Sequence, residues 1–254
     1  MIDAHVHLDD DKFDGIREEI IANFKADNIN YCVNCASDYQ TMLSSLALAT
    51  KYQEIYCALG CHPHDAKTYD KSFENKIIEL ANNPKVVAIG EIGLDYYYEL
   101  SDKITQKEVF IRQILLADQL KLPIVLHIRE AYQDALDILT QYKGNLNNGV
   151  MFHCFSGSAE IASQLVKLGY YFSFGGVITF AKHKPEVIKQ IPLTQILTET
   201  DAPYLAPIPF RGKLNQPKYI SYVLPILSQA YQLTSSQLET QLEQNLKILF
   251  KKIK

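Results

Sequence analysis

Residues 1–8 of the chain read MIDAHVHL, a short β-rich run that places His5 and His7 two positions apart. Side chains two positions apart on a strand point to the same face, and Asp3 shares that parity. The run therefore predicts an opening strand whose polar side chains all point one way, toward the interior if the strands close into a barrel.

The alternation of β-rich runs and amphipathic helical stretches continues to the other end of the chain. Seven further strands are expected, at 29–36, 54–61, 85–92, 123–128, 149–155, 170–177 and 194–199. Helices are expected at 14–27, 39–52, 72–82, 105–121, 130–142, 158–168, 185–190, 216–232 and 235–253. Eight strands, each followed by a helix, indicate a parallel sheet, and 254 residues suit its closure. We expect one α/β domain over residues 1–254, a (β/α)8 TIM barrel with its catalytic site at the C-terminal ends of the strands.

The composition bounds the class of protein. Net charge is −4, from 25 Lys plus Arg against 29 Asp plus Glu. This balance argues against a broad basic surface for nucleic acid, but it allows an enzyme that neutralises phosphates with bound cations. With five Cys, no secretory pattern and no apolar run long enough to cross a bilayer, we expect a reduced, cytoplasmic protein without membrane contact.

Residues that commonly bind metals recur where the expected strands end. A single His on an apolar strand is usually a packed core residue, but the recurrence of six such residues at the catalytic end of a barrel is hard to attribute to packing. Imidazole and carboxylate ligands suit Zn, Mn, Fe or Ni, and carboxylates with water suit Mg as well. The candidate ligands are His5, His7, Glu91, His127, His153 and Asp201.

Glu91 stands between two groups of these candidates, and a carboxylate in that position can bridge two cations. Two metals a few Å apart can hold a shared hydroxide and stabilise both the attacking and the leaving oxygen of a phosphodiester. We therefore expect two divalent ions (Mg, Mn, Zn or Ni), although one metal is also sufficient for hydrolysis.

Seven segments spread over the whole chain carry a specific resemblance. In chain order they are DAHVHL (3–8), GCHPH (60–64), GEIGLDY (90–96), LPIVLHIR (122–129), HCFSG (153–157), ETDAPYL (199–205) and RGKLNQP (211–217). Together they resemble the TatD family of metal-dependent deoxyribonucleases, a branch of the amidohydrolase-like barrels. The chain departs from the family pattern at Gln216, where an acidic residue is frequent, and this bears on contacts of the loop.

The resemblance implies a TIM barrel, one to three divalent ions and a 3′ to 5′ exonuclease acting on DNA, single-stranded or at an end. By the same resemblance, the first metal is held by His5, His7, Glu91 and Asp201. The second is held by Glu91, His127 and His153. Asp201 and Glu91 are the candidate catalytic residues, with Asp201 as the base, and Glu199 is a weaker candidate for a third ion.

Five further residues are candidate contacts for the substrate: His62, His64, Arg129, Arg211 and Asn215. The two His flank Pro63 just past the third expected strand, where they can contact a phosphate, a leaving group or an additional metal, or else cap the loop. A planar guanidinium suits bidentate phosphate binding, but Arg129 can equally fix a neighbouring carboxylate.

Two further patterns have ordinary structural explanations. Cys32 and Cys35 form a C-x-x-C pair, but it falls on an expected strand, so we interpret both as small core residues. The tyrosines at 96–98 either stack on a base at the mouth of the barrel or simply pack at its rim.

Two other functions remain open at this point. Another metallohydrolase of the same barrel class, an amidohydrolase or an aminoacyl-tRNA deacylase, would share the metal centre, because one scaffold supports many reactions. The apparent bridge Glu91, together with Arg129, favours phosphoester cleavage, since many amidohydrolases use a carboxylated Lys instead. A catalytically silent binding protein is the second alternative, and the intact set of ligands argues against it.

Overall fold

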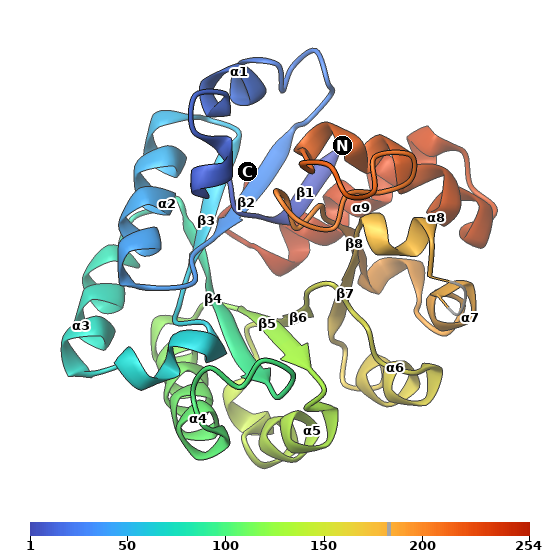
Figure 1. The fold of residues 1–254 in the computed structure, drawn as a ribbon. Helices are drawn as coiled ribbons and strands as arrows, with labels where there is room; N and C mark the ends of the chain where they lie inside the picture. The colour runs from blue at the N-terminus through green and yellow to red at the C-terminus, as the bar shows by residue number, and fades with distance from the viewer. Residues whose placement is uncertain (182–183) are drawn as a thin grey trace.

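The computed structural model describes residues 1–181 and 184–254. Its eight strands are β1 (Ile2–Val6), β2 (Tyr31–Cys35), β3 (Ile55–Leu59), β4 (Val86–Asp95), β5 (Ile124–Arg129), β6 (Val150–Phe152), β7 (Tyr171–Phe174) and β8 (Ile196–Thr198). Every paired strand is parallel to its neighbour, in the order β1 to β8. The expected (β/α)8 barrel is confirmed (Figure 1).

Backbone contacts between the first and last strand regions close the barrel. The amide of His7 donates to the carbonyl of Ala202 at 2.8 Å, and the amide of Asp201 donates to the carbonyl of His5 at 3.0 Å. The segment after β8 therefore lies directly beside the end of β1, which brings Asp201 next to the two His of the opening motif.

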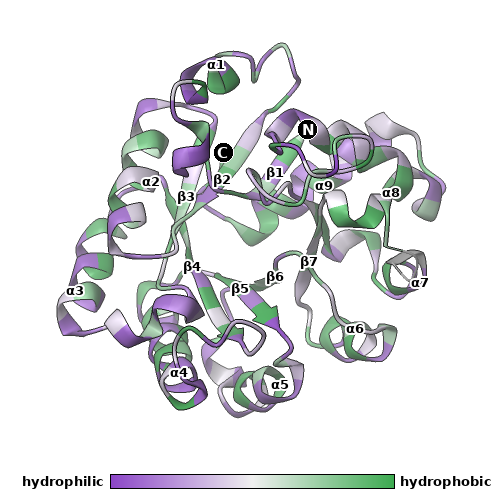
Figure 2. Cartoon of the chain, viewed as in Figure 1, coloured by the Kyte–Doolittle hydropathy of each residue, from purple (hydrophilic) through white to green (hydrophobic). Residues whose placement is uncertain are grey.

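Helices surround the sheet on its outer side (Figure 1). They are α1 (Arg17–Ala22), α2 (Tyr39–Lys51), α3 (Lys71–Leu80), α4 (Lys103–Leu120), α5 (Tyr132–Gln141), α6 (Ala159–Val166), α7 (Lys184–Ile188), α8 (Leu224–Tyr231) and α9 (Ser235–Leu249). These helices carry hydrophilic as well as hydrophobic residues, as amphipathic helices against a sheet do (Figure 2). Among the helices that the structure describes, none is both long enough and apolar enough to cross a membrane.

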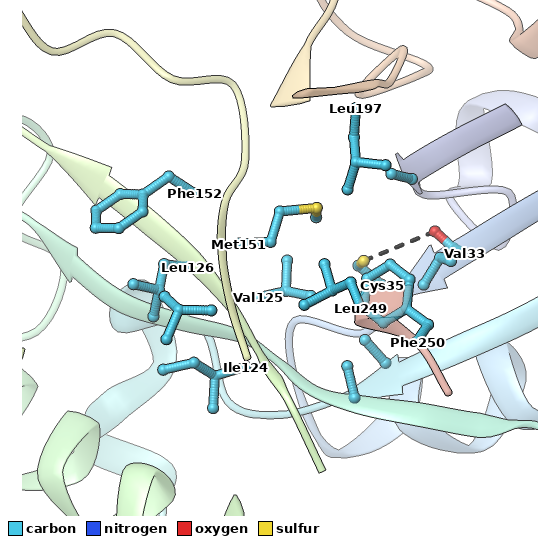
Figure 3. Packing of buried hydrophobic residues seen from close by; sticks show 14 of the residues in the cluster. Val33, Cys35, Ile124, Val125, Leu126, Met151, Phe152, Leu197, Leu249 and Phe250 are labelled. Atoms are coloured by element: carbon cyan, nitrogen blue, oxygen red, sulfur yellow. Dashed lines mark hydrogen bonds between the residues drawn. The ribbon is translucent and has the colours of Figure 1, made fainter. Parts of the chain in front are cut away.

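Apolar side chains from several strands fill the barrel (Figure 3). Val125 of β5, Met151 of β6 and Leu197 of β8 are fully buried there, close to Leu249 at the end of α9. Cys35 lies in the same cluster, with its Sγ 3.7 Å from the carbonyl oxygen of Val33. The interpretation of Cys35 as a core residue is confirmed, and Cys32 is likewise fully buried.

Several expected elements differ from those observed, most of them by being a few residues shorter, such as the helix expected at 14–27, which is α1 (Arg17–Ala22). The fourth strand continues to Asp95 instead of ending at residue 92, because residues 93–95 keep pairing with β5 after a shift in register. A Cβ on Gly93, which has φ +141°, would lie 2.1 Å from the carbonyl oxygen of His127, so only glycine allows this close approach. Glu91 thus lies inside β4 and not at its end. The continuous helix expected at 216–232 is instead a 3-10 helix, Pro217–Tyr222, followed by α8, since Pro225 in the first turn cannot donate a hydrogen bond back to residue 221.

Candidate metal centre

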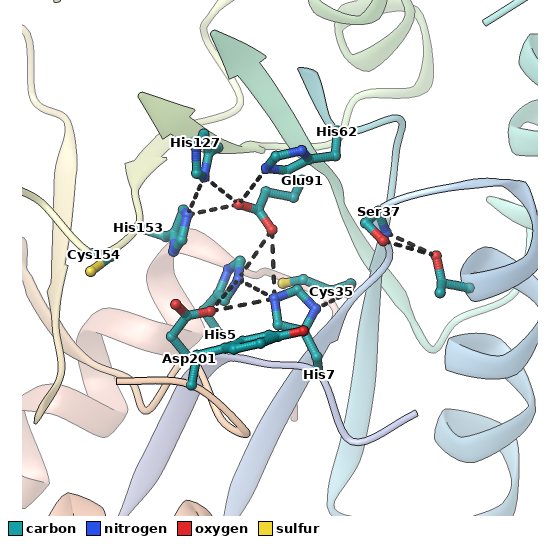
Figure 4. A network of polar contacts seen from close by, with 12 residues as sticks. His5, His7, Cys35, Ser37, His62, Glu91, His127, His153, Cys154 and Asp201 are labelled. Atoms are coloured by element: carbon teal, nitrogen blue, oxygen red, sulfur yellow. Dashed lines mark hydrogen bonds and ion pairs between the residues drawn. The ribbon is translucent and has the colours of Figure 1, made fainter. Parts of the chain in front are cut away.

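The six candidate ligands converge at the C-terminal end of the barrel (Figure 4). His5 lies in β1, Glu91 in β4 and His127 in β5. His7 and His153 directly follow β1 and β6, and Asp201 lies three residues after the end of β8. The C-terminal ends of the parallel strands all lie at one face of the barrel, so residues far apart in the sequence are close together there. The six are His5, His7, Glu91, His127, His153 and Asp201.

The two carboxylate oxygens of Glu91 face two different sets of side chains. Oε2 lies 3.3 Å from His5 Nε2 and 3.6 Å from His7 Nε2. Asp201 Oδ1 lies 3.6 and 3.4 Å from the same two nitrogens. We call His5, His7 and Asp201 the first ligand group.

Oε1 of Glu91 faces the second ligand group, which consists of His62, His127 and His153. It lies 2.7 Å from His153 Nε2, 2.8 Å from His127 Nδ1 and 3.5 Å from His62 Nε2. One carboxylate therefore stands between two clusters of nitrogen and oxygen donors, as a bridge between two cations would.

Hydrogen bonds orient several of these rings. His7 Nδ1 lies 2.8 Å from the carbonyl oxygen of Cys35, which leaves Nε2 to face the first ligand group. His127 turns its Nδ1 to Glu91, while its Nε2 lies 2.9 Å from Oδ2 of Asp95. Such partners of the second ring nitrogen select the tautomer and orientation of a metal-binding His.

Burial and neighbouring charges both shift the pKa values of the histidines. Burial lowers the pKa of His5 to about 4, with a further contribution from His153, and it also lowers the pKa of His62 to about 4. Burial would lower the pKa of His7 as well, but the hydrogen bond to Asp201 and the charge of Glu91 outweigh it and raise this pKa to about 9. In the same way, Glu91 raises the pKa of His153 to about 10 despite its burial.

The carboxylates respond to the same histidines. Burial would raise the pKa of Glu91, but the imidazoles around it hold the pKa well below its usual range. The pKa of Asp201 is lowered against its burial, chiefly by the hydrogen bond with His7. Both carboxylates are therefore ionised at neutral pH, which is the form that binds a cation.

The donor set fits divalent cations. Within the described residues, the donor atoms of His5, His7 and Asp201 lie within 4.8 Å of one another, and so do those of His62, Glu91 and His127. Buried, closely spaced imidazoles and carboxylates suit Zn, Mn, Fe or Ni. Both groups adjoin the carboxylate of Glu91, so the described residues form a candidate metal centre around it.

Glu199 faces Nδ1 of His153, whereas Glu91 faces Nε2 of the same ring. The rings of His5 and His153 are stacked, with their centroids 3.9 Å apart. The carboxylate of Glu199 accepts hydrogen bonds from the Cys154 amide at 2.7 Å and from the Ser173 hydroxyl at 2.5 Å. His153 Nδ1 lies 3.9 Å from Glu199 Oε2, and burial raises the pKa of Glu199 to about 7. Together with His5 and His153 it forms a third cluster of donors, and the role of Glu199 toward a third ion stays a prediction.

The candidate substrate residues have different positions. His62 is buried within the second ligand group, so its place is that of a ligand more than of a substrate contact. The Nε2 atom of His64 lies 3.1 Å from Asp95 Oδ2, and its side chain is a quarter exposed. The guanidinium of Arg129 lies over the ring of Tyr97 at 4.0 Å, at the rim of the mouth.

Arg211 and Asn215 lie in the loop after β8. Arg211 is exposed, with its guanidinium 4.4 Å from the ring centroid of Phe180. Asn215 is fully buried: its side-chain NH2 donates to the carbonyls of Thr200 and Tyr204, and its Oδ1 accepts from the amide of Gln216. These contacts give Asn215 a structural role, while its contact with substrate stays a prediction. Asn215 fixes the loop that carries Asp201.

Asp95 is the residue of the site that sequence reasoning missed. It is fully buried, and its Oδ2 faces both His64 and His127, while its Oδ1 accepts hydrogen bonds from two backbone amides. The signal was present in the segment GEIGLDY, where Asp95 shares the parity of Glu91. Because the fourth strand is expected to end at residue 92, the sequence does not predict that Asp95 lies in the site.

Comparison with known proteins agrees with this geometry. The model of the family described as TatD related DNase matches residues 2–251. The chain belongs to the TatD family. The uncharacterized metal-dependent hydrolase YabD of Bacillus subtilis is 41% identical over 253 residues, which is 99% of each chain. The uncharacterized metal-dependent hydrolase YcfH of Escherichia coli K12 is 35% identical over 226 residues, 87% of this chain and 84% of that one.

A solved structure of a TatD family protein has the same fold. YjjV, a TatD homolog from Escherichia coli K12, superposes with a TM-score of 0.91 at 30% identity, covering 99% of this chain and 98% of that one. The chain is thus a TatD-type member of a family of metal-dependent hydrolases, and the two ligand groups around Glu91 are its candidate metal centre.

Proposed function

We propose that this TatD family member is a deoxyribonuclease that hydrolyses DNA phosphodiester bonds, as a 3′ to 5′ exonuclease, with two divalent ions. The observation that carries the proposal is the position of Glu91, whose Oε2 faces the first ligand group and whose Oε1 faces the second. A pair of ions held in this way suits a phosphodiester, because both the attacking and the leaving oxygen need stabilisation.

When bound, the divalent ions supply Lewis-acid stabilisation of the phosphate charge and lower the pKa of a coordinated water. His5, His7 and Asp201 would hold the first ion and His62, His127 and His153 the second, with Glu91 shared. Asp201 is held ionised by its neighbours, and its Oδ1 faces His5 and His7, so Oδ2 would accept the proton from the attacking water.

Positive charges at the rim support an anionic substrate. Arg129 lies at the end of β5, and Lys12 lies near the end of β1 beside Tyr204. The chain as a whole has a net charge of −4, so these local cations and the bound metals would provide the attraction for phosphate.

The test is an activity panel on protein that has been stripped of metal and reconstituted separately with Mg, Mn, Zn or Ni. We expect end-labelled single-stranded DNA to be shortened from its 3′ end, with the activity abolished by EDTA and by Glu91→Gln. Duplex DNA, RNA, aminoacyl-tRNA and simple esters complete the panel. Hydrolysis of aminoacyl-tRNA or esters without cleavage of DNA would replace this proposal with the deacylase or amidohydrolase alternative.

A further inference from the structure

Two pairings of exposed tyrosine with a cation flank the candidate metal centre. We call Tyr97, Tyr98 and Arg129 the Arg129 station, and Tyr204 with Lys12 the Lys12 station. In the part of the chain that is described, both stations border the mouth into which the ligands point.

The Arg129 station is built on the residues that support the second ligand group. The guanidinium lies 4.0 Å from the ring centroid of Tyr97 and 4.8 Å from that of Tyr98, and both side chains are 53% exposed. Their backbone amides donate to Oδ1 of Asp95 at 3.0 and 2.9 Å, while Oδ2 of the same carboxylate contacts His127. Asp95 therefore fixes the backbone that carries the two rings and also contacts the candidate ligand His127.

Arg129 forms no ion pair with the residues that the structure describes. Among residues 1–181 and 184–254, its guanidinium has no carboxylate within 4.0 Å, and its neighbours are the two rings. A stacked guanidinium keeps its N–H donors at its edge, where they can meet a phosphate.

The Lys12 station adjoins the first ligand group. Lys12 Nζ lies 3.9 Å from the ring centroid of Tyr204, whose hydroxyl donates to Oδ2 of Asp10 at 2.6 Å. The amide of Tyr204 donates to the carbonyl of Asp201, and its ring centroid lies 6.2 Å from that of His7. Tyr204 is 43% exposed, so part of its ring is open to a ligand.

The topology of the barrel sets the two stations on opposite sides of the mouth. The Arg129 station follows β4 and β5, whereas the Lys12 station follows β8 and β1 (Figure 1). In a closed ring of eight strands these pairs lie half a turn apart. The two oxygens of Glu91 lie between them, each facing the ligand group that adjoins one station.

We propose that the two stations bind the nucleotides on either side of the scissile phosphate, each stacking one base on tyrosine and placing its cation near the sugar–phosphate backbone. This inference rests on the proposed function and names how its substrate is held. Base–aromatic stacking tolerates any base, because every base has a π face, so the stations would position the strand without reading its sequence. The neighbouring nucleotides must unstack from each other to reach stations half a barrel apart.

The test pairs the stations with single nucleotides of the substrate. The dinucleotide dTpdT has one diester bond, and two analogues lack the base on the 5′ or on the 3′ side. We expect Tyr98→Leu and Tyr204→Leu each to lower kcat/KM for dTpdT about 5- to 100-fold, the range for losing one stacked base. A variant should show no loss on the analogue that lacks the base stacked on the substituted tyrosine, because that contact is already absent. The two variants should therefore each be insensitive to a different abasic analogue.

Tyr31→Leu is the matched control. Tyr31 begins β2, at the end of the barrel opposite the mouth, and Lys247 Nζ lies 4.9 Å from its ring centroid. The substitution therefore removes the same kind of tyrosine–cation pair at a place far from the metal centre. We expect it to match the wild type on all three dinucleotides. If Tyr98→Leu and Tyr204→Leu lose the same factor on all three substrates, or if both respond to the same abasic side, the two-station proposal is overturned.

A second readout does not depend on catalysis. Fluorescence anisotropy of labelled hexathymidylate, measured on the metal-free protein, should give a Kd that is about 5-fold or more weaker for Tyr98→Leu, Tyr204→Leu and Arg129→Gln than for Tyr31→Leu. If the wild type binds hexathymidylate through these residues but cleaves no DNA, the proposed function fails and the stations stand. If it cleaves DNA while binding is unaffected by the three variants, the stations fail and the function stands.

Discussion

Oδ2 of Asp95 lies 2.9 Å from Nε2 of His127, and this contact decides which nitrogen of His127 faces the metal centre. With Nε2 engaged by the carboxylate, Nδ1 is the atom that approaches Glu91, at 2.8 Å. The carboxylate of Asp95 also favours an N–H on Nε2, which leaves the lone pair of Nδ1 available for a cation.

Replacing Asp95 with Asn should therefore weaken the second ligand group. The amide keeps the shape but is a poorer acceptor for the Nε2–H of His127, so we expect the affinity for the more weakly held ion to fall about 10- to 100-fold. Metal titration of the variant measures this. His64→Gln, which removes the other His in contact with Asp95, should change the affinity less, and an equal loss in both variants would mean that Asp95 does not act through His127.

Asp201→Asn separates metal binding from base chemistry. The substitution keeps an oxygen ligand near His5 and His7 but removes the charge and the basicity of the side chain. Activity on DNA should fall by at least about 100-fold, the lower end for losing a general base, while metal content falls much less. Both quantities are to be measured on one preparation. Near-normal turnover with metals still bound would show that Asp201 is not the base.

The affinity for metal should rise with pH between about 6 and 8. In the metal-free protein the pKa of His7 is raised to about 9 and that of His153 to about 10, against burial, by their carboxylate neighbours. Both are therefore protonated in this range, and each must release a proton before it can bind a cation. Each proton displaced gives about a tenfold gain in affinity per pH unit. Kd values for Mn or Zn at pH 6, 7 and 8 test this, and a Kd independent of pH would contradict it.

Bound metal should also stabilise the fold. Glu91 is almost fully buried, and a cation that binds only the native state adds about 2.7 kcal/mol at a hundredfold excess over Kd. We expect a higher Tm with Mn or Zn than with EDTA. Glu91→Gln serves as the control, because losing the shared ligand should remove most of the difference, and a variant that keeps the full shift in Tm would argue against the bridge.

Asn215→Ala should affect stability more than substrate binding. Its side chain donates to the carbonyls of Thr200 and Tyr204 at 2.8 and 2.6 Å, the first of these hydrogen bonds being buried, and an unsatisfied buried group costs about 1–3 kcal/mol. Chemical denaturation should show a loss of this order in the free energy of unfolding. A higher KM for DNA without any loss of stability would instead support Asn215 as a substrate contact.

Several features were accessible from the sequence alone. Apolar residues recur with a local period in runs such as MIDAHVHL. That period predicts the strands, the helices and the common face of His5 and His7. Repetition of the strand–helix unit eight times, with candidate ligands at the strand ends, indicated both the barrel and the end that carries the site. These inferences need only interactions between residues that are near in the chain.

Other features depend on which side chains meet after the barrel has closed, and a local pattern does not contain that information. The pairing of residues 93–95 with β5 extends β4 and turns Asp95 toward His127, and the parity of Asp95 with Glu91 alone does not show that the strand continues so far. Burial between the loop after β8 and the barrel makes Asn215 a structural residue, while its polar character suggested a surface contact. The division of the ligands between the two oxygens of Glu91 follows from the register and closure of the strands, which are set by packing between residues distant in sequence.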